Sequence, residues 1–204
     1  GLFVFTTACE QLHAWHKKGF DQLHMAINVS AREFQLSDYP IVIAHLLAEM
    51  EVDPKFIELE LTESIVMENP QKTLMMLNVI KKLNLSLAID DFGTGYSSLS
   101  YLTRFPLDIL KVDKAFVREL STNKNAAAVA AAIVSMAHDL NLKVVAEGVE
   151  TQQQLEFFMV RECELIQGFY FSKPLPSHEA EKVLEPEWRK QFEKMASTPK
   201  FIRH

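Results

Sequence analysis

Cysteine is scarce in this chain. Its two cysteines, Cys9 and Cys163, lack the spacing of a metal site. Disulfide frameworks are typical of cysteine-rich secreted proteins, so two cysteines in a chain of 204 residues favour a reducing compartment. The longest hydrophobic run, Ala126 to Met136, is alanine-rich and much shorter than a bilayer span. No stretch has the pattern of a signal peptide. We expect a cytoplasmic location without a membrane segment in this chain, or the cytoplasmic part of a larger membrane-attached protein.

Basic residues are also fewer than acidic ones, with 21 lysines and arginines against 27 aspartates and glutamates, so the net charge is -6. This balance argues against binding long nucleic acid through a general basic field, but it does not exclude a small anionic ligand. The sequence has no dinucleotide-binding glycine motif, no Walker motif, no zinc-binding His-Glu-x-x-His and no repeat. A hydrophobic content of 48% is enough for one sizeable core, so a single domain is the default.

Strand-like and helix-like segments alternate along the chain. Apolar, strand-like runs end near Ser30, Thr62, Asp91, Asp113, Val149 and Phe171. Helix-like segments cover residues 6–18, 39–50, 71–83, 126–140 and 151–160. This alternation predicts repeated βα units and a parallel sheet. Prolines 174 and 176 stop the last strand, and helical spacing then continues from Ser177 to about Met195, so we assign residues 178–204 to a C-terminal helix and tail.

Polar residues lie in or at the end of each of the six strand-like runs. They are Asn28, Glu60, Asp90, Asp91, Lys111, Asp113, Glu147 and Gln167. Buried charges are costly unless they are paired or bind a metal. Active sites of β/α barrels gather at the carboxyl ends of several strands, so this distribution favours a barrel over an open sheet.

Asp90 and Asp91 follow an apolar run and precede Gly93 and Gly95. Neighbouring side chains of a strand point to opposite faces, so both carboxylates share a face only if the chain turns there, which the glycines permit. The alternative is an ordinary strand-to-helix loop in which Asp caps, Gly bends and residues 97–98 cap the next helix.

A closed (β/α)8 barrel needs eight strands, and the sequence provides six runs. The first residues, Gly1-Leu-Phe-Val-Phe, are either one more strand or the start of a buried helix. We therefore expect that about two strands are missing at the amino end. Such a barrel would expose edges and core, so it should be unstable, oligomeric or completed by a partner.

The polar set is rich in oxygen ligands, which suit Mg²⁺ or Mn²⁺ rather than zinc. Two such ions favour phosphoester hydrolysis. Lys111 either orients water and neutralises charge, or forms a salt bridge to Asp113 or a neighbouring carboxylate. Glu147 is a reasonable general base. Asn28 is either a metal ligand or a strand-end cap.

Six motifs carry a family resemblance. They are Asn28-Val-Ser-Ala-Arg-Glu-Phe, Glu58-Leu-Glu-Leu-Thr-Glu-Ser, Asp90-Asp-Phe-Gly-Thr-Gly-Tyr-Ser-Ser-Leu, Leu110-Lys-Val-Asp-Lys-Ala-Phe-Val, Val144-Val-Ala-Glu-Gly-Val-Glu-Thr and Gln167-Gly-Phe-Tyr-Phe-Ser-Lys-Pro-Leu-Pro. In this order they resemble the EAL-domain family of bacterial cyclic-di-GMP phosphodiesterases. The resemblance implies a TIM-like barrel with one antiparallel strand, and metal-dependent hydrolysis of cyclic-di-GMP to linear pGpG.

The resemblance also implies a role for each matching residue. Metal ligands would be Asn28, Glu60, Asp90 and, for a second ion, Asp91. Lys111 would hold the water and phosphate region, Glu147 would be the general base, and Gln167 would support the water or metal shell. Supporting roles would fall to Glu63, Asp113 and Glu150. Glu63 would steady the loop Phe92-Gly93-Thr94-Gly95, and residues 94–98 would be coupled to formation of a homodimer.

The Glu-Ala-Leu signature that names the family is absent from this chain. It belongs on a strand ahead of Gly1, where the strand count also predicts a gap. We therefore expect residues 1–204 to be an EAL domain that is incomplete at its N-terminus and follows sensory or diguanylate cyclase domains. Two functions remain open: a phosphodiesterase, or an inactive EAL module that binds cyclic-di-GMP or a protein partner.

Overall fold

The computed structural model describes residues 1–93, 95 and 99–184. It divides into two units, Gly1–Phe171 and Ser172–His204, of which the second is described only to residue 184. Ser97 and Ser98, expected to cap a helix, lie outside the described residues. The predicted site residues of the strand-like runs all fall in the first unit.

One parallel sheet organises the first unit. Its six strands follow each other in chain order across the sheet, and each is parallel to its neighbours. They are β1 (Met25–Asn28), β2 (Ile57–Thr62), β3 (Ser86–Phe92), β4 (Ile109–Val112), β5 (Lys143–Ala146) and β6 (Leu165–Ile166). This order is that of successive βα units, as the alternation of the sequence predicts. The antiparallel strand implied by the resemblance is not among these six.

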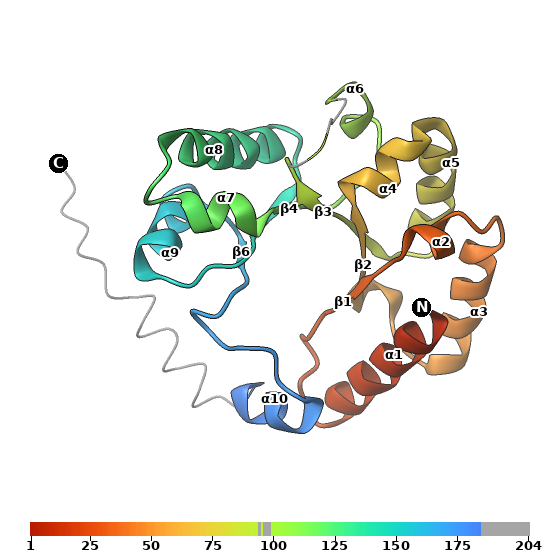
Figure 1. Ribbon diagram of the computed structural model, residues 1–204. Helices are drawn as coiled ribbons and strands as arrows, with labels where there is room; N and C mark the ends of the chain where they lie inside the picture. Colours follow the sequence, from red (N-terminus) through yellow and green to blue (C-terminus); the bar gives the residue numbers. More distant parts are fainter. Residues whose placement is uncertain (94, 96–98, 185–204) are drawn as a thin grey trace. The chain divides into compact units, whose positions relative to one another are not determined.

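Helices connect the strands and lie on the outer side of the sheet, which curves around one axis (Figure 1). They are α1 (Leu2–Lys17), α2 (Ala31–Phe34), α3 (Tyr39–Met50), the 3-10 helix η1 (Pro54–Phe56), α4 (Glu63–Glu68), α5 (Pro70–Lys81), α6 (Leu99–Leu102), α7 (Lys114–Glu119), α8 (Lys124–Asp139) and α9 (Gln152–Met159). The opening residues thus belong to α1, which settles the choice between a strand and a helix, but Leu2, Phe3 and Val4 are exposed, so the helix does not begin buried as expected. In the second unit, α10 covers Ser177–Leu184, and the rest of the predicted tail helix lies outside the described residues.

Helix starts follow local sequence signals. Ser30 and Glu33 form a reciprocal capping box at the start of α2, and Thr151 and Gln154 do the same for α9. Asn123 caps α8 by accepting hydrogen bonds from two backbone N–H groups. These caps satisfy N–H groups that have no partner within the helix, so they fix where each helix begins.

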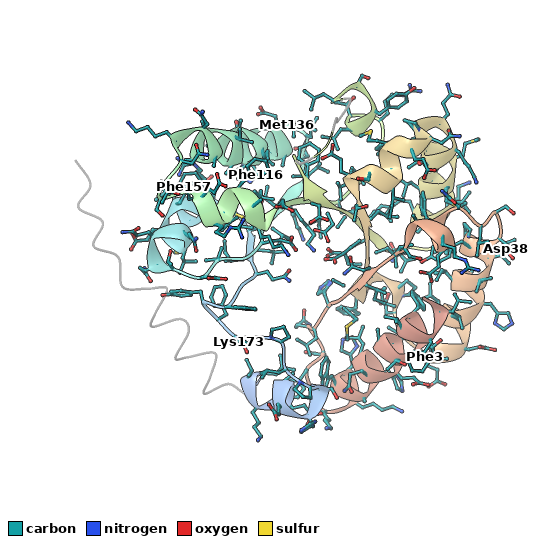
Figure 2. The ribbon with its side chains drawn as sticks, viewed as in Figure 1. Phe3, Asp38, Phe116, Met136, Phe157 and Lys173 are labelled. Carbon is teal, nitrogen blue, oxygen red and sulfur yellow. The ribbon has the colours of Figure 1, made fainter. Side chains whose placement is uncertain are left out.

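The two faces of the sheet differ sharply. Outward side chains such as Leu59, Leu87 and Leu110 are fully buried in the main core under the helices. Partly buried side chains of the outer layer, including Phe116 and Met136 labelled in Figure 2, pack against this core. Residues that alternate with the outward set point to the inner face, where polar side chains are interspersed with a small separate cluster of Ala88, Ile109 and Val145.

Two expected strands are shorter in the structure than in the sequence analysis. The expected run through Phe171 ends as β6 at Ile166, because the next residues turn: the N–H of Tyr170 donates to the carbonyl of Val149 at 2.9 Å. The run expected to reach Val149 ends as β5 at Ala146. The segments that follow the two strands are bonded to each other, since the N–H of Val149 also donates to the carbonyl of Gln167 at 3.0 Å. None of the described helices is long and apolar enough to cross a membrane.

Candidate functional site

Lys111 is the centre of a buried ionic cluster on the inner face. It extends from β4, its side chain is 3% exposed, and its ammonium contacts carboxylates from three other parts of the sheet. The Nζ atom lies 2.6 Å from Glu60 Oε1 on β2, 2.7 Å from Glu147 Oε1 after β5 and 3.3 Å from Asp90 Oδ1 on β3. Lys111 therefore forms salt bridges with neighbouring carboxylates, one of the two alternatives left open. Asp113 is not among its ion-pair partners in the described part of the chain.

Asp90 and Asp91 share one face because the backbone turns between them. The pairing of β3 with β4 shifts register between Ile89 and Phe92, and Asp91 has a positive φ of 55°. The N–H of Asp91 also donates to Asp90 Oδ1 at 2.9 Å. As a result, carboxylate oxygens of Asp90, Asp91 and Glu147 all lie within 4.8 Å of one another.

Phe92 differs from expectation. It was assigned to the loop, but it is the last residue of β3, pairs with Val112 and is 3% exposed. The bulge at the preceding aspartates accounts for the difference, because it absorbs one residue and lets the strand resume pairing before the turn.

Glu63 anchors the turn that follows the strand. It is the first residue of α4, is 2% exposed, and its Oε2 accepts a hydrogen bond from the N–H of Gly93 at 2.9 Å. A Cβ atom at Gly95 would lie 2.8 Å from Glu63 Oε1, so glycine lets the loop approach this carboxylate closely. The contact supports the predicted steadying role of Glu63. Thr94 lies outside the described residues.

The electrostatics of the cluster follow from burial. Burial raises the pKa of Glu147 to about 7, although the hydrogen bond and charge of Lys111 act in the opposite direction. Burial alone would lower the pKa of Lys111, but its hydrogen bonds to Glu147 and Glu60 outweigh burial and place it above the ordinary value. Burial, then a hydrogen bond with Asp113, raises the pKa of Asp91. The cluster therefore holds more negative charge than its one lysine neutralises.

The other predicted residues lie around this cluster. Asn28 ends β1 directly beside Glu60 in the sheet register. Gln167 directly follows β6, and its N–H donates to the carbonyl of Ala146, the last residue of β5, at 2.8 Å, which extends the pairing of these two strands by one hydrogen bond. Asp113 caps α7, accepting from the N–H of Ala115 at 2.6 Å.

A cavity of about 500 Å³ adjoins the cluster at Glu147. Residues from α7, from the segment after β5 and from the turn after β6 line it: Lys114, Arg118, Glu147, Gly148, Glu150, Gln154, Gln167, Gly168 and Phe169. Gly168 packs so closely on Val149 that an added Cβ would lie 2.1 Å from the Val149 carbonyl oxygen. The predicted residues Glu147, Glu150 and Gln167 thus meet in one cavity.

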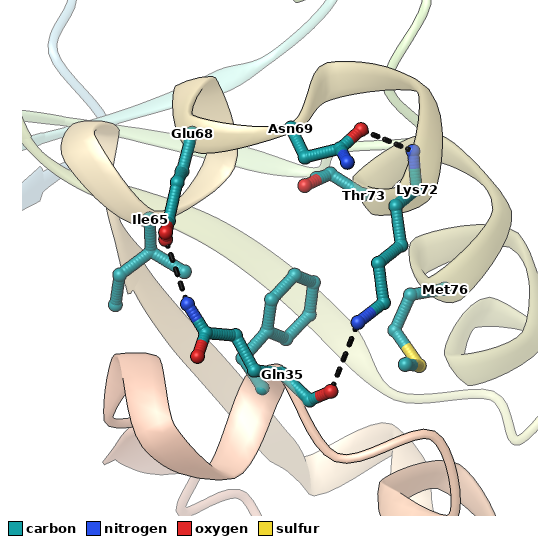
Figure 3. Close-up of a pocket in the computed structure, with 8 residues that line it drawn as sticks. Gln35, Ile65, Glu68, Asn69, Lys72, Thr73 and Met76 are labelled. Atoms are coloured by element: carbon teal, nitrogen blue, oxygen red, sulfur yellow. Dashed lines mark hydrogen bonds between the residues drawn. The ribbon is translucent and has the colours of Figure 1, made fainter.

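A second cavity, of about 440 Å³, lies between α2, α4 and α5 and contains none of the predicted residues (Figure 3). Its polar groups bind each other: Gln35 Nε2 donates to Glu68 Oε2 at 2.9 Å, and Lys72 Nζ donates to the Gln35 carbonyl at 3.0 Å. The cavity beside Glu147 is the better candidate site, because its lining includes Glu147 of the ionic cluster.

Sequence reasoning gave no role to three charged residues here. Glu58 lies two residues before Glu60 and so on the same, inner face of β2; burial, followed by the charge of Glu60, raises its pKa to about 7. The strand periodicity was the signal that could have identified it. Lys114 and Arg118 line the cavity, and the sequence offered only their four-residue spacing after Asp113.

Comparison with known proteins identifies the family. The model of the EAL domain matches residues 1–174. The chain belongs to the EAL-domain family. This confirms the resemblance found in the sequence, and the structural matches below confirm a TIM-like barrel fold of which six parallel strands are described.

Among curated proteins, the EAL chain is 43% identical over 182 residues to the cyclic di-GMP phosphodiesterase NbdA of Pseudomonas aeruginosa, covering 89% of this chain and 23% of NbdA. Among solved structures, the PaMucR phosphodiesterase in complex with c-di-GMP matches with a TM-score of 0.85 and 38% identity, over 87% of this chain and 72% of that one. Klebsiella pneumoniae BlrP1 in a manganese and cy-diGMP complex matches with a TM-score of 0.77 and 31% identity, over 86% and 44%. The chain spans about a quarter of the length of the curated relatives that it matches.

Proposed function

We propose that this EAL domain is a metal-dependent phosphodiesterase that hydrolyses cyclic-di-GMP to linear pGpG. One observation carries the proposal: Asp90, Asp91 and Glu147 bring carboxylates within 4.8 Å of one another at the carboxyl edge of the sheet, with Lys111 bonded to Glu147. Family relatives named as cyclic di-GMP phosphodiesterases support the reaction and the substrate.

The donor set fits a hard divalent cation. The cluster consists of carboxylates, with the Asn28 amide beside Glu60 in the register, and oxygen donors of this kind suit Mg²⁺ or Mn²⁺. Asn28, Glu60, Asp90 and Asp91 would hold the metal, two ions in all. When bound, the ions would supply charge stabilisation and activation of water. The manganese complex of BlrP1 supports this assignment.

The protein's own residues would transfer a proton and stabilise the negative charge that develops in the reaction. Glu147 would take a proton from the attacking water while the new oxygen–phosphorus bond forms. The bond between phosphorus and the 3′ oxygen breaks, and this oxygen leaves with a proton from solvent. Lys111 would offset the negative charge that develops, because its ammonium is fixed between Glu60, Asp90 and Glu147. Glu63 would hold the Asp90–Asp91 turn in place through Gly93.

The test is formation of pGpG from cyclic-di-GMP by the chain, with Mg²⁺ or Mn²⁺ and with EDTA. We expect turnover with metal only, and a loss of at least about a hundredfold in Glu147→Gln, the range of a general base. The control is Glu156→Gln, on the exposed face of α9, which should keep wild-type turnover.

Binding of cyclic-di-GMP without cleavage under all metal conditions would contradict the enzyme proposal. It would favour the alternative, a module that binds the dinucleotide as a receptor. Turnover that persists in Glu147→Gln would remove the base assignment alone.

A further inference from the structure

Two cations in the cavity beside Glu147 have no assigned role. Lys114 and Arg118 lie four residues apart on α7, so they share one face of the helix, and both line the cavity and are exposed. Neither forms an ion pair with another described residue. Like charges at this spacing destabilise a helix slightly, so the pair does not itself stabilise α7.

The backbone holds these cations next to the general base. A Cβ atom at Gly148 would lie 2.7 Å from Lys114 Cβ, so the start of α7 packs tightly on the residue that follows Glu147. Lys114 is also close enough for its charge to oppose the rise in the Asp91 pKa. A ligand in the cavity would therefore meet Lys114 and Glu147 together.

The side-chain amide of Gln154 is committed to the fold, so the remaining side-chain donors in the lining are the two cations and the amide of Gln167. Gln154 Nε2 donates to the carbonyl of Val117 at 3.0 Å, and its Oε1 accepts from the N–H groups of Glu150 and Thr151 at 2.8 and 3.0 Å. Gln154 of α9 thus bonds to Val117 of α7 and lines the cavity with an amide whose oxygen and nitrogen are both already hydrogen-bonded. The charged groups facing the cavity are then two carboxylates, of which Glu147 is already bonded to Lys111, and the two cations.

Hydrolysis changes the charge of the ligand at this point. A phosphodiester carries one negative charge, whereas the terminal phosphate monoester formed by its hydrolysis carries about 1.5 to 2 negative charges near neutral pH. The additional charge would appear at the phosphorus that Glu147 serves. An ammonium and a guanidinium are the donors that proteins use for such a group.

We propose that Lys114 and Arg118 form a subsite for the terminal phosphate of the linear product pGpG. The subsite rests on the function proposed above, since that reaction creates this phosphate beside Glu147. It selects the product over the cyclic substrate and so sets how strongly the product inhibits the enzyme.

The test compares three ligands by calorimetry in EDTA, so that no metal contributes: pGpG, the same dinucleotide without its terminal phosphate (GpG), and cyclic-di-GMP. We expect the wild-type chain to bind pGpG about tenfold more tightly than GpG, the usual effect of charge-assisted hydrogen bonds. Lys114→Gln and Arg118→Gln should each reduce this ratio to about twofold or less, without weakening GpG. Arg104→Gln, at an exposed arginine outside the cavity, should leave the ratio unchanged.

Equal affinities of the wild-type chain for pGpG and GpG would overturn the proposal. So would variants that weaken all three ligands to the same extent, because that result indicates a disturbed fold or a general field. A chain that cleaves cyclic-di-GMP but shows no such ratio would refute the subsite alone. A chain that shows the ratio but never cleaves would instead contradict the proposed enzyme function.

Discussion

Replacing Lys111 with methionine should destabilise the fold far more than an ordinary lysine substitution. Methionine keeps most of the side-chain volume and removes the ammonium. Its three partners, Glu60, Asp90 and Glu147, would keep side chains that are only 7%, 13% and 14% exposed, so water would screen them little. Breaking a buried ion pair by removing one partner costs about 3–5 kcal/mol.

Protonation of Glu147 limits this cost. Burial raises the pKa of Glu147 to about 7 even with Lys111 beside it, and loss of Lys111 would raise it further, so neutralising Glu147 in the variant at pH 8 costs at most about 1.4 kcal/mol, the value of one pH unit. We therefore expect Lys111→Met to lose about 3 kcal/mol of unfolding free energy at pH 8, the lower end of the range for a broken buried ion pair. The loss should shrink as the pH falls, because Glu147 of the variant becomes neutral. The raised pKa of Lys111 means that its own contribution is fully present below pH 10.5 and is lost only as the pH rises through the folded value.

Urea unfolding in EDTA at pH 8 and pH 6 measures the loss of unfolding free energy in Lys111→Met and its dependence on pH. Lys81→Met is the matched control: Lys81 Nζ contacts both Asp108 oxygens, at 2.7 and 2.5 Å, but its side chain is 35% exposed, so its loss should cost about 1 kcal/mol or less. If the two variants lost equal stability, or if the loss in Lys111→Met did not depend on pH, the description of Lys111 as the counter-ion of buried carboxylates would be wrong.

Three further predictions concern other parts of the chain. Gly168→Ala should cost more than about 3 kcal/mol in urea unfolding, because the new Cβ meets backbone at 2.1 Å, whereas Gly19→Ala, with open space and a φ of 96°, should cost about 1 kcal/mol. Burial raises the pKa of Cys9 and of Cys163 to about 11, so at pH 8 both thiols should react slowly with a disulfide reagent until urea is added. Burial opposes ionisation of Glu164, but hydrogen bonds from a backbone N–H of β5 and from a histidine outweigh it and lower its pKa. Glu164→Ala should therefore be less stable than wild type at pH 7, and the difference should narrow as the pH falls below 4.5 in thermal unfolding.

The inner-face residues could be predicted because strand periodicity and strand ends are local properties. Glu60, Asp90 and Lys111 interrupt apolar runs, and a residue that interrupts the buried pattern of a parallel strand is either paired or functional. The sequence also predicted the order of the βα units, since caps and apolar periodicity define each one. It did not predict the short helices α2, α4 and α7, because one or two turns are too few for a periodic pattern, whereas the serines at 97 and 98 indicated a helix start where α6 begins.

The geometry that makes a site of these residues could not be predicted. Whether Asp91 joins Asp90 depends on a single backbone angle, which tertiary pairing on both sides of the bulge imposes. The partners of Lys111 depend on the register of four strands, so sequence reasoning left its salt bridge open. The role of Lys114 depends on how closely α7 approaches Gly148, which is a packing property.

Charge counting explains why stability and function oppose each other at this edge of the sheet. Glu60, Asp90, Asp91 and Glu147 offer four carboxylates, and Lys111 forms ion pairs with Glu60, Asp90 and Glu147 within the described part of the chain, so full ionisation of these five side chains gives a charge of 1 - 4 = -3. An apolar set of the same volume would be at least as stable. The proposed site would use this excess negative charge to bind a divalent cation, and the cation would offset the burial that raises the pKa values of Asp91 and Glu147. We expect Lys111 to keep the carboxylates together before a cation binds and to hold Glu147 in place afterwards.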